Sequence, residues 1–142
     1  MADIKGAESD LTLNSHRLVK LTFLSAKQAG PGDIVLAQAN LSPRSEITKA
    51  SNQLTVKMSF NAKTTQEDGE LFTIQLEYIG QFSYSSALKE DTVTAFANVN
   101  APAILYPMVR AAVSFMTVSA GYPPLTLPVL NFQKIKTEVV SN

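Results

Sequence analysis

Cysteine is absent from this chain of 142 residues. Its absence excludes disulfide frameworks, thiolate nucleophiles and zinc sites built from thiolates. It also fits a reducing compartment, and the opening segment MADIKGAESD has mixed charge without the apolar core of a signal peptide. Together these observations predict a cytoplasmic protein.

Groups able to perform acid, base or nucleophilic chemistry are scarce. His16 is the only histidine, and it stands at a polar position of an alternating segment, which favours a solvated surface residue over a catalytic base. No nucleophile elbow, glycine-rich phosphate loop or metalloprotease motif occurs. The acidic pair Glu67-Asp68 and the run Lys89–Asp91 are typical of solvated turns rather than of metal ligands. The sequence therefore predicts no enzyme activity, no cofactor and no metal.

Charge of one sign is not in excess, because twelve basic and twelve acidic side chains give a formal charge of zero. The basic residues are scattered, so no electrostatic footprint for nucleic acid is present. Only Ala101–Ala120 is apolar enough to be considered as a membrane span. Pro107 and Arg110 lie inside it and no cluster of basic residues flanks it, which argues against insertion.

What the sequence does contain is alternation of apolar and polar residues. The clearest case is Leu54–Ala62, which predicts a strand with one buried and one wet face. Leu71–Tyr84 follows an Asp-Gly turn pair and predicts the second arm of an antiparallel hairpin with a somewhat long loop. Leu11–Phe23 predicts another long strand, in which Leu18 and Leu24 break the alternation and indicate strong twist, a bulge or a second covered face.

Two further elements, a strand and a C-terminal helix, are predicted from weaker patterns. A strand over Asp33–Ala39 follows a Gly-Pro-Gly turn, and the stretch Ser42–Ser45, with its proline, interrupts it. Residues Asn131–Val139 predict a short final helix, with Phe132 and Ile135 on one side.

The longest apolar stretch begins with a predicted helix. Asn100 is a plausible N-cap and Pro102 suits a first helical turn, while Gly121 is placed to end the helix in the left-handed conformation. Pro107 should bend the first turns unless the regular helix begins near it. The prolines that follow Tyr122 exclude a regular helix or a central strand, so an extended apolar loop is expected there.

This predicted helix is apolar on nearly every side, so nearly all of its surface must be buried against something. One helix on a four-stranded sheet cannot bury itself all round or cover both faces of the sheet. A single packed core remains one interpretation. The pattern favours association with another subunit or a ligand.

Several motifs share order and spacing with one known family. Ala101–Arg110 (APAILYPMVR) is similar to C-P-x-I-L-F-P-Y-A-R, and Gly121–Leu127 with Asn131-Phe132 is similar to G-x-F-P-x-L-x-L followed by V-N-F. Leu21–Phe23 and Gly80–Ser83 give weaker support as counterparts of I-S-F and G-I-F-S. On these residues the chain resembles the SecB family of export chaperones.

The resemblance implies a single α+β domain over residues 1–142. Its fold would be a four-stranded antiparallel sheet with one long helix and a short C-terminal helix on one side. It also implies a homotetramer, a dimer of dimers, that acts as an ATP-independent holdase for unfolded preproteins. The residues expected to bind clients are Tyr106, Met108, Tyr122, Leu125, Leu127, Phe132 and Ile135. Those expected at an oligomer interface are Val109, Ala112, Phe115 and Met116.

The chain departs from the family at positions linked to delivery. Family members that deliver clients to the SecA motor carry carboxylates on the sheet, where this chain has Lys20, Leu24 and Gln75. Two groove aromatics are replaced, by Met108 and Lys136. Three hypotheses follow: export through SecA, protection of an antitoxin as in some relatives, or an oligomeric scaffold that has lost client binding.

Overall fold

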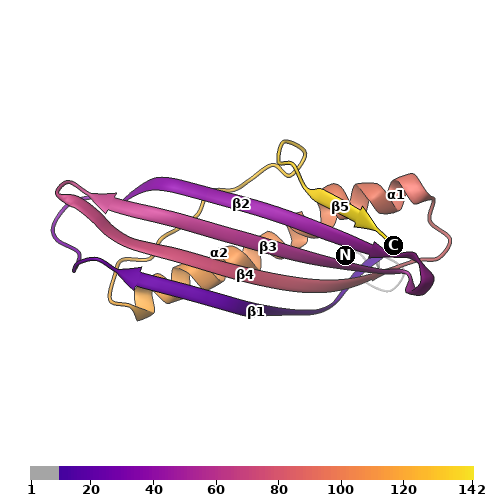
Figure 1. The fold of residues 1–142 in the computed structure, drawn as a ribbon, viewed down its shortest axis with the longest axis horizontal. Helices are drawn as coiled ribbons and strands as arrows, with labels where there is room; N and C mark the ends of the chain where they lie inside the picture. The colour runs from indigo at the N-terminus through magenta and orange to yellow at the C-terminus, as the bar shows by residue number, and fades with distance from the viewer. Residues whose placement is uncertain (1–9) are drawn as a thin grey trace, which may run out of the picture.

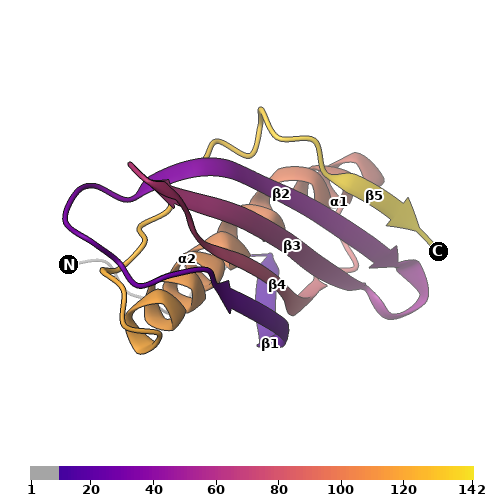
Figure 2. The same ribbon diagram turned by 60° about the vertical axis from the view of Figure 1, so that its left-hand side comes forward.

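The computed structural model describes residues 10–142, so the N-terminal segment interpreted above falls, except for Asp10, outside the described residues. One sheet has the strand order β1-β4-β3-β2-β5. A long helix covers one face of this sheet (Figure 1 and Figure 2). The strands are β1 (Leu11–Ser25), β2 (Val35–Thr48), β3 (Gln53–Gln66), β4 (Gly69–Tyr84) and β5 (Glu138–Ser141). The α+β prediction with four antiparallel strands is confirmed, and β5 adds to the edge of β2 in parallel.

The β3–β4 hairpin forms the centre of the sheet because its alternation is nearly unbroken. Even-numbered residues from Leu54 to Gln66 and from Phe72 to Phe82 are buried on the helix-covered face. The hairpin loop is shorter than predicted, since pairing continues to Gln66 opposite Gly69. Polar residues extend the strand because their side chains have partners: Thr64 Oγ1 donates to Phe72 O at 3.2 Å, and Gln66 bonds Gly30 at 2.9 Å.

The first strand contains the bulge that its broken alternation indicates. Its register with β4 shifts between Leu13 and Ser15 and again between Leu18 and Lys20. Between the two shifts Leu18 lies opposite Tyr78, on the helix-covered face, and after the second shift Leu24 lies opposite Thr73, on the other face. The first shift also moves His16 to the helix-covered face, where it is exposed and its Nδ1 lies 2.7 Å from the Tyr78 hydroxyl.

Strand β2 does not stop at Pro43, which corrects the predicted interruption at Ser42–Ser45. Pro43 is buried opposite Met58, and the pairing with β3 runs on to Thr48. A proline is tolerated in a strand where its missing N–H faces an unpaired edge. The pairing of β2 with β5 begins one residue later, at Arg44.

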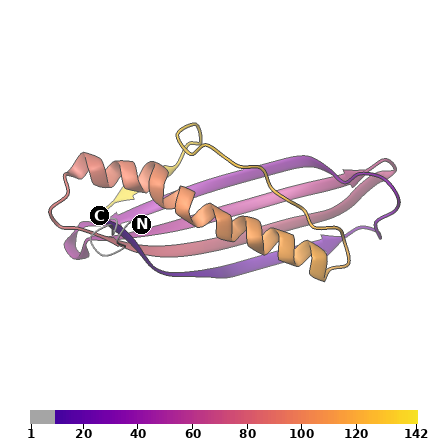
Figure 3. The ribbon, with the colours of Figure 1, turned by 180° about the vertical axis from the view of Figure 1, so that it is seen from behind.

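The helix begins ten residues earlier than predicted and runs as a continuous 30-residue segment from Glu90 to Ser119 (Figure 3). It consists of α1 (Glu90–Ala95), a π-helical turn η2 (Phe96–Asn100) and α2 (Ala101–Ser119). Asn100 has helical dihedral angles and caps nothing, so its assignment as the N-cap is wrong. Gly121, with φ of 90°, follows the end of the helix as expected.

Two hydroxyls explain how the helix passes through Pro102. Proline has no N–H to offer to the carbonyls four and five residues before it, which belong to Asn98 and Ala97. The Ser45 hydroxyl donates to Ala97 O at 2.6 Å, and the Thr137 hydroxyl donates to Asn98 O at 2.9 Å. Both side chains are buried. The π turn and the proline therefore leave no carbonyl unpaired at these two positions.

The predicted short helix over Asn131–Val139 is absent, and a turn followed by β5 takes its place. Residues 137, 139 and 140 are β-branched, which favours a strand once a sheet edge is available. Pairing with β2 supplies that edge, and the Arg44–Glu138 ion pair at 2.9 Å joins the two strands. Non-local pairing therefore overrides the local helical pattern.

We expect Ser45→Ala to lower the free energy of unfolding by about 1–3 kcal/mol, because it leaves the buried carbonyl of Ala97 without a donor. Urea denaturation measures this change. Ser42→Ala, at an exposed position of the same strand, should change stability by less than about 0.5 kcal/mol. Equal effects of the two substitutions would contradict the capping role of Ser45.

Candidate functional site

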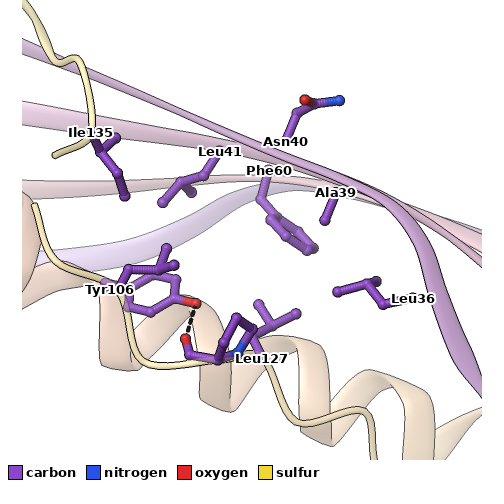
Figure 4. Close-up of a pocket in the computed structure, with 10 residues that line it drawn as sticks. Leu36, Ala39, Asn40, Leu41, Phe60, Tyr106, Leu127 and Ile135 are labelled. Carbon is purple, nitrogen blue, oxygen red and sulfur yellow. Dashed lines mark hydrogen bonds between the residues drawn. The ribbon is translucent and has the colours of Figure 1, made fainter.

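An apolar cavity lies between the helix-covered face of β2 and β3, the helix α2 and the loop that follows α2 (Figure 4). Its volume is about 320 Å³. No charged side chain lines it. The lining residues are Leu36, Ala39, Asn40, Leu41, Phe60, Tyr106, Leu127, Pro128, Leu130 and Ile135.

The polar side chains of the lining, Tyr106 and Asn40, do not offer a free hydrogen-bonding group to the cavity. The Tyr106 hydroxyl donates to Pro128 O at 2.7 Å (Figure 4). The Asn40 side chain turns away from the cavity (Figure 4) and donates to Asn61 at 3.4 Å. What remains is a surface that can cover apolar side chains, at roughly 25 cal/mol per Å² of buried apolar area.

The loop wall of the cavity is fixed to α2 by side-chain hydrogen bonds along the helix. Thr117 Oγ1 accepts from Leu125 N at 3.0 Å, and Arg110 Nε donates to Leu127 O at 3.0 Å. The Tyr106 bond to Pro128 is the third of these contacts. The loop therefore runs back along the helix with the carbonyls of Leu127 and Pro128 and the N–H of Leu125 bonded to helix side chains, and Arg110 has a structural partner.

The phenol of Tyr106 is kept in its protonated, donating form. Burial raises the pKa of Tyr106, and the nearby Arg110 guanidinium opposes part of this effect. Its ring also packs edge to face on Phe132, with the ring centroids 5.5 Å apart. The ring thus supports the loop from below while its hydroxyl holds the loop backbone.

The structure brings together only part of the predicted client-binding set. Tyr106, Leu127 and Ile135 line the cavity, whereas Met108 is half-buried on the helix away from it. Three others point into the core beneath the loop, namely Tyr122, Leu125 and Phe132. The loop offers less apolar surface than its composition suggests, because most of its large side chains pack inward. Its most exposed apolar side chain is Val129, at 82%.

The predicted interface residues also divide. Phe115 is 75% exposed, while Val109 is completely buried in the core of this chain. Val109 therefore has no surface that a second copy could contact, which removes it from the interface set. Ala112 and Met116, on the same helix, are half-buried.

Sequence reasoning missed the strand side of the cavity. Leu36, Ala39 and Leu41 of β2 and Phe60 of β3 form this wall. The alternation of Leu54–Ala62 marked Phe60 as inward-facing. In the neighbouring strand β2, however, the register shift between Leu36 and Gln38 breaks the alternation that would have marked its inward-facing residues. Extending β2 through Pro43 would have placed Leu41 opposite Phe60, where the structure has it.

The opposite face of the sheet is not covered by the helix and carries mainly polar side chains, with Leu24 as an exposed apolar exception. Lys20, Gln75 and Leu24 all lie on it, opposite Glu77, Thr22 and Thr73 respectively. Lys57 and Glu77 form an ion pair of 3.4 Å on the same face. The three positions at which SecA-linked relatives would carry carboxylates therefore share one surface, and none of them is acidic here.

By length and composition alone, the helix Glu90–Ser119 could cross a membrane, a test that core helices also pass. Its inner stripe packs on the sheet. The buried residues of α2 are Ala101, Pro102, Leu105, Tyr106, Val109, Val113 and Thr117. Within residues 10–142 no cluster of three or more histidine, aspartate or glutamate side chains could hold a metal ion.

Replacing Tyr106 by phenylalanine removes the hydroxyl that holds Pro128, so we expect the free energy of unfolding to fall by about 1 kcal/mol. The raised pKa adds a pH dependence. The contribution of the hydroxyl is complete below the ordinary tyrosine pKa of 10.0 and is lost as the pH rises through the higher pKa of the folded protein. The difference between parent and Tyr106→Phe in urea denaturation should therefore shrink at high pH, and a constant difference would contradict it.

Comparison with known proteins supports the fold and gives its family. The SecB-like chaperone of Mycobacterium tuberculosis, in complex with a peptide from an antitoxin, has a TM-score of 0.73 over 85% of this chain and 91% of that chain, at 21% identity. The protein-export protein SecB of Anaplasma marginale is 34% identical over 84 residues, which are 59% of this chain and 48% of the relative. That of Dinoroseobacter shibae is 28% identical over 98 residues, or 69% and 56%.

These matches are partial, and the chain spans about half the length of the curated relatives named above. The family model described as preprotein translocase subunit SecB matches residues 36–141. That range includes all of β2 except Val35, the strands β3 to β5, the long helix and every residue that lines the cavity. This chain belongs to the SecB family.

Proposed function

We propose that this protein is an ATP-independent holdase chaperone that binds unfolded polypeptides and keeps them competent for translocation in protein export. The observation that carries the proposal is the cavity, whose walls are apolar and whose polar groups are turned away or already paired. Such a surface suits unfolded chains, because they expose the apolar side chains that folded proteins bury.

The chemistry of the cavity also suits binding without sequence specificity. Apolar burial is non-directional, so many different side chains can occupy the same space. The lining has no charged group that would repel a client segment carrying charge of one sign. We infer that Ile135 contacts clients directly, together with the strand residues Leu36 and Leu41, and that Tyr106 and Leu127, which are 5% and 2% exposed, form the floor of the cavity. Tyr122, Leu125 and Phe132 support the loop from the core, and Met108 lies outside the contact.

We infer further that the protein assembles as a homotetramer through the outer face of the helix. Ile104, Phe115 and Val118 are exposed on α2 at 41%, 75% and 52%. They are spaced by eleven and three residues, so they follow one side of the helix. Ala112 and Met116 border this stripe. A second copy would cover an apolar surface that a single copy leaves in water.

The polar face of the sheet bears on a second candidate function, protection of an antitoxin. The Mycobacterium tuberculosis neighbour is in complex with an antitoxin peptide. Here Lys20, Leu24 and Gln75 leave the open sheet face without the carboxylates expected for docking of the SecA motor. Export is favoured by the protein-export relatives, and antitoxin protection by this face. In either role we infer a cytoplasmic, non-enzymatic protein.

Client binding is tested by suppression of the aggregation of a reduced, unfolded protein. Leu41→Asp places a charge in the cavity and should weaken binding by about tenfold or more, since the contact of one large apolar side chain is worth roughly 1.5–3 kcal/mol. Ser42→Asp, on the opposite face of the same strand, is the matched control. Melting temperatures establish that both variants fold. Equal protection by both would contradict the assigned cavity, and no protection by the parent would favour the scaffold hypothesis.

Assembly is tested by light scattering of Phe115→Asp. Because Phe115 is exposed in the single chain, the substitution should leave the fold intact and shift the mass from tetramer to smaller species. Gln75→Asp, a change at an exposed position on the open face of the sheet, should leave the tetramer unchanged. A monomeric parent, or a tetrameric Phe115→Asp variant, would contradict the proposed interface.

A further inference from the structure

The edge of β2 is covered by β5 over only part of its length. Pairing with β5 extends from Arg44 to Ile47. Over Val35–Pro43 no strand or other backbone segment within residues 10–142 pairs with this side of β2. An uncovered strand edge presents alternate backbone N–H and carbonyl groups, which can accept another extended chain.

The uncovered part of β2 is also the rim of the apolar cavity. Leu36, Ala39 and Leu41 point from it into the cavity, and Leu127 faces them from the loop (Figure 4). A chain paired with this edge would direct every second side chain to the cavity side of the sheet. Backbone pairing and apolar burial would therefore act on the same bound segment.

The attachment of β5 is slight. It has four residues, of which Glu138 and Ser141 are exposed and Val139 and Val140 are half-buried. The Arg44–Glu138 ion pair is solvent-exposed, with side-chain exposures of 49% and 64%, so it adds little. At the far end Asn142 N donates to Ile47 O at 2.9 Å, Asn142 O accepts from Lys49 N at 3.2 Å, and the exposed Asn142 side chain donates to Glu46 at 2.6 Å. A four-residue parallel edge strand without a fully buried side chain belongs to the part of a fold that opens most readily.

The segment leading to β5 is continuous with the cavity wall. Ile135 lines the cavity, and β5 starts three residues later. Between them Thr137 holds the carbonyl of Asn98 in the π turn. The outer edge of β2 is thus continuous. It is open beside the cavity, and beyond Pro43 it is paired with β5 (Figure 1).

We propose that, without a client, β5 occupies part of the edge of β2 to which clients bind. An extended apolar segment of an unfolded polypeptide displaces β5 by pairing with this edge. This inference rests on the proposed holdase function and adds the mode and regulation of binding. The bound segment would pair first along Val35–Ser42, place alternate side chains in the cavity, and then take the position of β5. Because backbone pairing does not depend on sequence, it strengthens binding without narrowing the range of clients.

A reversible cross-link tests the displacement. Arg44 and Glu138 are register neighbours whose side chains already touch, and the chain has no cysteine of its own. Within one chain, the variant Arg44→Cys/Glu138→Cys can therefore form only the disulfide that locks β5 in place, and non-reducing electrophoresis separates it from disulfides between chains. Binding is measured with fluorescently labelled, reduced and carboxymethylated α-lactalbumin, which stays unfolded. We expect the oxidised variant to bind about tenfold more weakly than the same variant after reduction with dithiothreitol.

The matched control is a lock elsewhere in the sheet. Asn61→Cys/Gln75→Cys joins exposed register neighbours of β3 and β4 on the open face, and its oxidation should not change binding. Hydrogen exchange of the parent gives the direct measurement. Amides of Glu138–Ser141 should lose protection when the client binds, while amides of β2 before Pro43 gain it.

The outcomes separate the two proposals. Equal binding by the oxidised and reduced forms of Arg44→Cys/Glu138→Cys would overturn the displacement of β5 while leaving the holdase function standing. Unchanged protection of the β5 amides in the client complex would do the same. Failure of the parent chain to bind the unfolded probe at all would overturn both. If the oxidised lock changes the mass in light scattering while binding is unaffected, β5 acts in assembly and the proposal is wrong.

Discussion

The packing of α2 across the β3–β4 hairpin is the contact on which the rest of the structure depends. At Gly80 the helix comes so near that an added Cβ would lie 2.7 Å from Cδ1 of the buried Leu105. This close approach fixes the height of the helix over the sheet. The loop after the helix is bonded back to it through Thr117, Arg110 and Tyr106, so the cavity exists because the helix holds its second wall at a set distance from β2.

The elements with strong local patterns were predictable, and those that depend on distant partners were not. Alternation predicted β3, β4 and the bulged β1, and Gly121 marked the end of the helix. The beginning of the helix was missed because Pro102 is normally a sign of a first turn, whereas here Ser45 and Thr137, far away in sequence, satisfy the carbonyls it leaves free. The strand β5 was missed for the same reason, since its partner is the edge of β2.

The candidate site follows the same division. Helix and loop residues were visible as an apolar excess, but the sequence could not say which of them point outward. Leu125 and Phe132 pack into the core. Which side of the helix is exposed became clear only from the burial of Val109 and Val113 against the sheet. The strand wall at Leu36 and Leu41 needed the register of β2, which no local pattern carries. Family resemblance supplied the class of protein, and physical contacts supplied the shape of the cavity.

The two irregularities in β1 have a consequence for solubility. This strand is the other edge of the sheet, and a long regular edge invites copies to stack into continuous sheets. The register shifts after Leu13 and Leu18 interrupt its hydrogen-bonding pattern, and Arg17 and Lys20 add charge beside the second. A protein with an open apolar cavity is thereby protected, along this edge, from polymerising with itself.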